Sequence, residues 1–227
     1  MEKRALFDKT VLNVLSFLES CAECHSLDFR PGDEVQAHEV AIWEKRNAPY
    51  KLPTDLKNFH SIFNGIQLNW NAEIGDRSIN IGEIKVNKLE DIERFIVNGF
   101  FQNKWKDVSI NCPDFAKAVA YTIDTCDVGT VHLLYQNNDE RNEEGSNYPN
   151  PLENPEVWLV DRCGRYHYIC PSFKQYLRLM VTHLGIRGWQ LAFTPEGLSP
   201  ETQQWMNIFC KERLITDLDS HLVQLNL

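Results

Sequence analysis

The spacing of the hydrophobic residues changes twice along this chain of 227 residues, and this change limits the fold more than any other feature. Apolar side chains recur at helical spacing over residues 6–18 and again over 173–184. Between these segments they alternate with polar ones, as at Ile66, Leu68 and Trp70. Helices that precede and follow a run of strands favour an α+β fold, with N-terminal and C-terminal helices packed on a mostly antiparallel sheet.

The same pattern gives an expected order of elements. Helices are predicted over residues 6–18, from Val40, over 52–64, 89–97 and 172–184, from Ser199 and from Leu214, and strands over 66–70, 79–84, 118–123, 131–135, 157–160 and 166–169. The helix that begins at Ser199 is expected to bury Trp205, Ile208 and Phe209. A chain of this length usually forms one or two domains. We therefore expect a single domain over 1–227, in which 1–35 is an N-terminal helix and linker, 136–155 an acidic surface loop and 172–227 a helical C-terminal part.

The chain is acidic, because 32 Asp and Glu residues against 23 Lys and Arg residues give a net charge of −9. An acidic protein binds nucleic acid or an anionic membrane poorly, because like charges repel. No apolar run approaches the roughly 20 residues that cross a bilayer. Seven cysteines, an odd number, and a start without a signal peptide favour free thiols and a cytoplasmic location.

Motifs of catalysis are missing from the sequence: it contains no GxGxxG, P-loop, GxSxG or HExxH pattern. We therefore expect neither an enzyme nor a bound cofactor. The segment Cys21-Ala22-Glu23-Cys24-His25 matches the CxxCH pattern of haem attachment, and its two cysteines also have the spacing of a zinc-ligand pair. No second ligand pair completes a zinc site, and the alternative interpretation is a helix end with two ordinary thiols. Asp161-Arg162 is interpreted as a turn ion pair or cap rather than a catalytic pair.

Two groups of motifs resemble known families. The first resembles the N-terminal signature of the SUKH superfamily and consists of Trp43-Glu44, Leu52-Pro53, Leu56-Lys57-Asn58-Phe59, Asn64-Gly65, Trp70 and Ile81-Gly82. The second resembles a narrower eukaryotic family, the subunit 2 family of tubulin polyglutamylase complexes, and consists of residues 156–162 and 176–185, Trp189-Gln190, Ala192-Phe193, Gly197-Leu198-Ser199-Pro200 and Gln204-Trp205. The resemblance covers approximately residues 40–209.

This resemblance implies a non-catalytic adaptor or scaffold subunit. In such a complex the ligase chemistry belongs to a separate tubulin–tyrosine-ligase-like chain, which adds glutamate to tubulin tails. The implied partners are the other subunits of the complex, and tubulin or microtubules are contacted indirectly. The implied location is the cytoplasm and the cytoskeleton, including the centrosome or ciliary base.

Binding to partner subunits is expected to depend on a few aromatic and arginine anchors. Chosen for residue type and for their place in the family-specific region, the candidates are Trp158, Arg162, Tyr166, Tyr168 and Trp189. Each of them is equally compatible with a role in the core. Two other functions stay open: a SUKH-fold module with another partner, in immunity or signalling, and a metal-binding protein that uses Cys21, Cys24 and His25.

Overall fold

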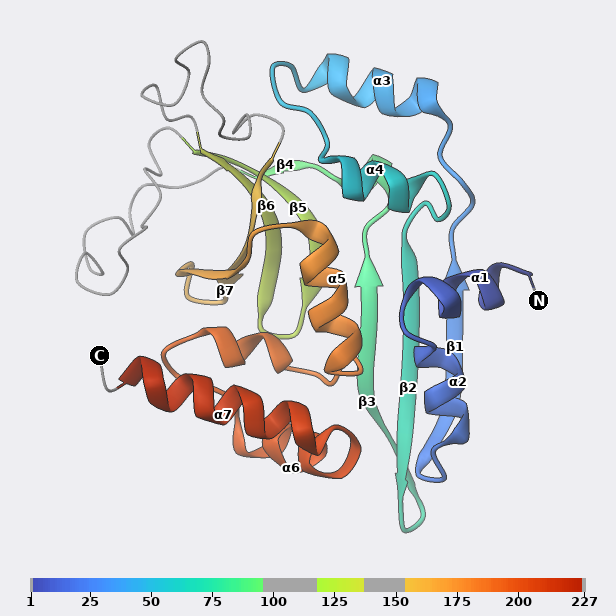
Figure 1. Cartoon of the computed structure of the whole chain (residues 1–227), viewed down its shortest axis with the longest axis vertical. Helices are drawn as coiled ribbons and strands as arrows, with labels where there is room; N and C mark the ends of the chain where they lie inside the picture. Colours follow the sequence, from blue (N-terminus) through green and yellow to red (C-terminus); the bar gives the residue numbers. More distant parts are fainter. Residues whose placement is uncertain (1, 96–117, 137–153, 226–227) are drawn as a thin grey trace.

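Two antiparallel sheets form the centre of the molecule (Figure 1). The computed structural model describes residues 2–95, 118–136 and 154–225. The three-stranded sheet has the order β1-β2-β3 and the five-stranded sheet the order β4-β5-β6-β7-β8. The strands are β1 Cys24–Pro31, β2 Ile66–Ile74, β3 Arg77–Val86, β4 Arg94–Phe95, β5 Ala118–Cys126, β6 Gly129–Gln136, β7 Glu156–Asp161 and β8 Tyr166–Cys170. An α+β fold built on antiparallel strands is therefore confirmed, with two sheets where the sequence analysis expected one.

Helices gather at both ends of the chain. They are α1 Glu2–Thr10, α2 Val14–Ser20, α3 Ala37–Arg46, α4 Thr54–His60, α5 Phe173–Thr182, α6 Pro200–Phe209 and α7 Lys211–Leu225, with short 3₁₀ segments η1 Leu89–Asp91 and η4 Trp189–Phe193. Figure 1 shows α1 and α2 (blue) beside the three-stranded sheet and α5 to α7 (orange to red) beside the five-stranded one. No helix in the described ranges is long and apolar enough to cross a membrane.

Strand β2 shows how the sequence determines the packing of the three-stranded sheet. Its even-numbered residues from Ile66 to Ala72 are buried, and the odd-numbered ones between them are partly exposed, as expected when successive side chains point to opposite faces. The indole of Trp70 donates to the carbonyl oxygen of Leu184 at 2.8 Å. This bond joins the sheet to the segment that follows α5.

That segment also pairs with the edge of β3. The amide of Glu83 donates to the carbonyl of Gly185 at 2.8 Å, and the amide of Arg187 donates to the carbonyl of Ile81 at 3.0 Å. Gly185 has a φ of +62°, a conformation that L side chains rarely adopt. A glycine after α5 therefore lets the chain turn back onto the sheet.

The N-terminal helix expected over 6–18 is in fact two helices. Leu12 and Asn13 have φ values of +60° and +58° and break the helix between α1 and α2. The buried carboxylate of Asp8 accepts from the amides of Leu15 at 2.6 Å and Ser16 at 3.0 Å. These bonds satisfy two of the amides that the start of α2 leaves without a partner. A second helix can therefore begin directly after the break, and the apolar residues keep their helical spacing across it.

Two other expectations were wrong. The segment 21–35, expected to be part of a linker, contains β1, whose Phe29 ring packs at 4.7 Å from the ring of Phe7. The helix expected over 89–97 is instead η1 followed by β4, as far as the described residues extend. In both cases an edge strand is short or polar and lacks the alternation that identifies a central strand.

The C-terminal helices begin where their caps predict. Ser172 accepts from the amide of Gln175 at 3.3 Å, and Ser199 accepts from the amide of Thr202 at 3.1 Å. The expected burial of α6 is confirmed for Phe209 and partly for Trp205, which is half-buried. It was wrong for Ile208, which is 58% exposed.

The two hairpins expected around 118–135 and 157–169 are present as β5–β6 and β7–β8. The acidic loop predicted over 136–155 lies almost entirely outside the described residues.

Candidate functional site

The β7–β8 hairpin carries four of the five predicted anchors. Val157 and Leu159 of β7 point into the main core, and Trp158 between them points to the other face of the sheet, where it packs with Ala120 and Leu134. Trp158 is opposite Tyr168 in the register, and their rings are 5.4 Å apart. We call this surface the aromatic face and define it by Trp158, Tyr166 and Tyr168.

Exposure differs across the aromatic face. Tyr168 is 43% exposed, whereas Trp158 is 5% exposed and its indole donates to Glu156 at 3.1 Å. Tyr166 is half-buried and packs against the cluster that contains Trp158. Tyr168 is therefore the most exposed side chain of the aromatic face, and the ring of Trp158 packs against it.

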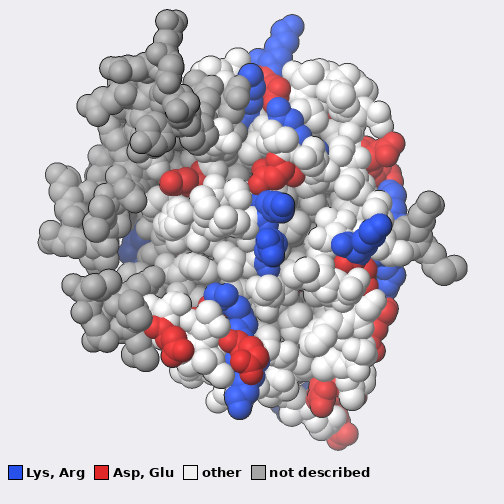
Figure 2. All heavy atoms as spheres, in the orientation of Figure 1, with Lys and Arg blue, Asp and Glu red and all other residues white. Residues whose placement is uncertain are grey.

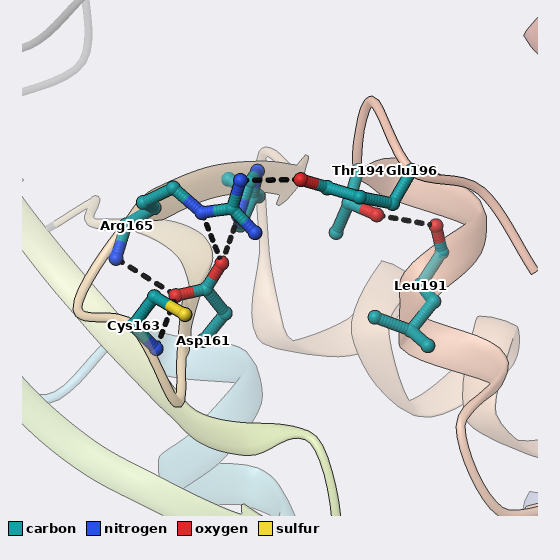
Figure 3. Close-up of polar contacts among 7 residues, drawn as sticks. Asp161, Cys163, Arg165, Leu191, Thr194 and Glu196 are labelled. Atoms are coloured by element: carbon teal, nitrogen blue, oxygen red, sulfur yellow. Dashed lines mark hydrogen bonds and ion pairs between the residues drawn. The ribbon is translucent and has the colours of Figure 1, made fainter. Parts of the chain in front are cut away.

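Arg162 lies in the turn between β7 and β8, and the shape of this turn is fixed by Asp161 (Figure 3). The carboxylate accepts from the amides of Cys163 at 2.8 Å and Arg165 at 2.9 Å, from Arg165 Nε at 2.6 Å and from His167 Nε2 at 3.0 Å. Partial burial raises the pKa of Asp161, but the hydrogen bonds from His167 and Arg165 outweigh it and hold this pKa below its ordinary value. The carboxylate is charged and holds the turn together.

The ion-pair partner of Asp161 is Arg165, not the adjacent Arg162. Arg165 also pairs with Glu196, which follows η4, so the hairpin is tied to the C-terminal part of the chain (Figure 3). Arg162 is exposed and has no ion pair among the described residues. Among the described residues, the guanidinium of Arg162 is therefore the one in this turn that makes no ion pair.

Trp189, the fifth predicted anchor, is separate from this surface. It is 1% exposed, and its ring stacks on that of His183 at 4.6 Å. His183 is itself buried and hydrogen-bonded to Asp217 at 2.8 Å, which joins α5 to α7. In this structure Trp189 belongs to the core and does not reach the aromatic face.

The CxxCH segment does not gather its three side chains. In the pairing of β1 with β2, Cys24 is opposite Ala72 and His25 is opposite Asn71, so consecutive side chains point to opposite faces of the sheet. His25 instead lies 3.7 Å from Glu73. Within the described ranges no group of three or more His, Cys, Asp or Glu side chains could hold a metal ion.

Sequence reasoning missed a small polar hollow where the two sheets meet the segment after α5. Its lining includes Asp124, Arg187, Trp189 and Gln190. Asp124 is fully buried and accepts from the Tyr176 hydroxyl at 2.8 Å, and burial raises its pKa to about 7. A free volume of about 20 Å³ has room for about one water molecule and none for a nucleotide. No spacing along the chain indicates this convergence.

Comparisons with known proteins agree with the resemblance found in the sequence. The chain is 26% identical over 219 residues to the tubulin polyglutamylase complex subunit 2 of Rattus norvegicus and to that of Mus musculus, and each match covers 89% of this chain and 71% of the relative. The Homo sapiens protein of the same name is 26% identical over 218 residues, with 89% of this chain and 69% of the relative covered. No protein-family model matches the chain. No solved structure matches it either. The similarity to subunit 2 is thus confirmed, and the likeness to the SUKH superfamily stays a prediction.

Proposed function

We propose that this protein is a non-catalytic adaptor of a tubulin polyglutamylase complex. It supports the assembly or localisation of a tubulin–tyrosine-ligase-like glutamate ligase, in the cytoplasm and at the cytoskeleton. The observation that carries the proposal is the similarity, over 89% of the chain, to three proteins named as subunit 2 of that complex.

The geometry supports an adaptor in two ways. The hollow beside Asp124 is too small for a nucleotide or a tubulin tail. On the face shown in Figure 2, acidic and basic side chains are interspersed, and no broad basic area is visible that would attract an acidic tail. A role in holding other subunits together therefore fits this surface better than capture of the tubulin tail itself.

We place the contact with another subunit of the complex at the β7–β8 hairpin. Tyr168 and Arg162 are exposed, and both belong to residue types that dominate binding energy at interfaces. The four hydrogen bonds to Asp161 fix the turn in advance, so little conformational freedom is lost when a partner docks.

The experiment is co-expression of the tagged chain with a ligase-like catalytic chain and the other subunits, followed by affinity purification and a tubulin glutamylation assay. We expect the ligase-like chain in stoichiometric amount and activity in the eluate, and none with the chain alone. A partner-free protein would overturn the adaptor role.

The docking surface is tested with the double variant Arg162→Ala/Tyr168→Ala. The matched control is Arg77→Ala/Ile74→Ala, because Arg77 is also an exposed arginine at a hairpin turn and Ile74 is 50% exposed. We expect the first variant to lose at least tenfold in partner recovery, with an unchanged melting temperature, and the control to keep it. Equal recovery of both variants would remove the β7–β8 hairpin from the interface and leave the adaptor role intact.

A further inference from the structure

The turn between α2 and β1 brings two thiols together. The amide of Cys24 donates to the carbonyl of Cys21 at 3.1 Å, which closes a four-residue turn around residues 22 and 23. The thiol of Cys21 is also close enough to the thiol of Cys24 to raise the pKa of Cys24. A closed turn keeps its end Cα atoms within about 7 Å, which is within the range that a disulfide can bridge.

The surroundings of Cys24 limit its reactivity. Burial raises the pKa of Cys24 to about 12, and the neighbouring Cys21 and Glu23 add to this effect. Cys21 donates to the carboxylate of Glu23 at 3.3 Å. Because the thiolate is the attacking species, the raised pKa of Cys24 assigns the second attack to Cys24.

The other described cysteines are not arranged in this way. Cys170 is buried and Cys126 and Cys210 are partly buried, and burial raises the pKa of each to about 12. Cys163 is exposed in the β7–β8 turn. It therefore serves as an internal control for a reactive thiol without a second thiol beside it.

We propose that Cys21 and Cys24 are a site of thiol–disulfide exchange. A small-molecule disulfide such as oxidised glutathione oxidises the two thiols to a Cys21–Cys24 disulfide. The Cys21 thiolate attacks one glutathione sulfur, the glutathione S–S bond breaks, and one glutathione leaves as a thiolate that takes up a proton. Cys24 then gives its proton to solvent and attacks Cys21 Sγ, which releases the second glutathione. Two protein thiols are oxidised to one disulfide, and one oxidised glutathione is reduced to two thiols.

The product would fix the start of β1. Cys24 is the first residue of this edge strand and is opposite Ala72 of β2. A bridge to Cys21 closes a short ring across the turn from α2, which restricts the unfolded chain and raises the melting temperature. The exchange is independent of the adaptor role.

The experiment treats the reduced, full-length protein with oxidised glutathione and maps the products by peptide mass spectrometry. We expect the peptide with Cys21 and Cys24 to lose two hydrogens and carry no glutathione, whereas Cys163 carries one glutathione. Dithiothreitol should reverse both changes. The variant Cys24→Ser should trap glutathione on Cys21, and Cys163→Ser should leave the disulfide unchanged.

Two results would overturn the proposal. One is a lasting glutathione adduct on Cys21 in the unsubstituted protein, as in Cys24→Ser. The other is an unmodified Cys21–Cys24 peptide under conditions in which Cys163 has reacted. Both are read from the unsubstituted protein, so they do not depend on the folding of any variant.

Discussion

Replacing the buried carboxyl group of Asp124 should change how stability depends on pH. Asp124 is 3% exposed, and burial among the surrounding strands and α5 is the main reason that its pKa rises from 3.8 to about 7. Glu83 raises this pKa further, whereas hydrogen bonds from Tyr176 and from the amide of Thr125, together with the charge of Lys85, lower it. The folded state therefore holds the proton of Asp124 more tightly than the unfolded state does.

The sign follows from this difference. The stability that Asp124 contributes through its raised pKa is fully present below pH 3.8. It is lost as the pH rises to about 7. The pKa difference of about 3 units, at about 1.36 kcal/mol per unit, corresponds to about 4 kcal/mol over the whole range. Integration of the same two pKa values gives a loss of about 2–3 kcal/mol between pH 5 and pH 8.

The assay is urea unfolding of the parent protein and of Asp124→Asn at several pH values, followed by tryptophan fluorescence. Burial lowers the pKa of His60 and of His132 to about 4, so these groups reduce stability as the pH falls below 6.5. Both proteins share this effect, and it cancels in their difference. We expect the parent to lose about 2–3 kcal/mol relative to the variant from pH 5 to pH 8.

A companion variant tests the hydrogen bond. Tyr176→Phe removes a donor that lowers the pKa of Asp124, so the end of the pH-dependent range should move above pH 7. The reasoning is refuted if the parent and Asp124→Asn have parallel stability curves between pH 5 and pH 8. Parallel curves would mean that the carboxyl group does not titrate in this range when the protein is folded.

Three further substitutions test the packing, each by urea unfolding at neutral pH. Gly82→Ala should cost about 3 kcal/mol, since an added Cβ would lie 1.9 Å from the indole nitrogen of Trp70; a loss below about 1 kcal/mol would show that the indole moves aside freely. Asp217→Ala should cost about 3–5 kcal/mol because it leaves the buried His183 without its carboxylate, and an unchanged midpoint would contradict that pairing. Ser199→Ala should cost about 1 kcal/mol through the lost helix cap, whereas Ser199→Thr, which can still cap, should keep most of the stability.

The sequence predicted those helices and strands that are determined by residues close to one another along the chain. The caps at Ser172 and Ser199 identify helix starts, and the alternation around Trp70 identifies a central strand. The break at Asn13 was missed because the compensating carboxylate lies five residues away, at Asp8, and only the folded turn brings it to the amides of α2. A local pattern cannot reveal an interaction that depends on tertiary placement.

The same argument applies to the candidate sites. Asp124 and Tyr176 are 52 residues apart in sequence, and only the packing of α5 against β5 brings them within 2.8 Å. Trp189 has the residue type of an interface anchor, but its environment is the core. Residue type and position in the family-specific region therefore selected four residues of one hairpin, but they did not distinguish exposed candidates such as Tyr168 from the buried Trp189.

The turn of the β7–β8 hairpin shows how a detail of geometry determines which residue is available for binding. Adjacent Asp161 and Arg162 were interpreted as a turn ion pair or a cap. The cap is confirmed, because the Asp161 carboxylate accepts from two turn amides, but its other contacts are with Arg165 and His167 and not with Arg162. Arg165 also donates from Nη1 to the carboxylate of Glu196. The only guanidinium of this turn that keeps all its donors free of described ion pairs is that of Arg162. It lies on a fixed backbone in the same hairpin as Tyr168, which is why the proposed interface depends on Arg162 and not on Arg165, whose guanidinium is already ion-paired.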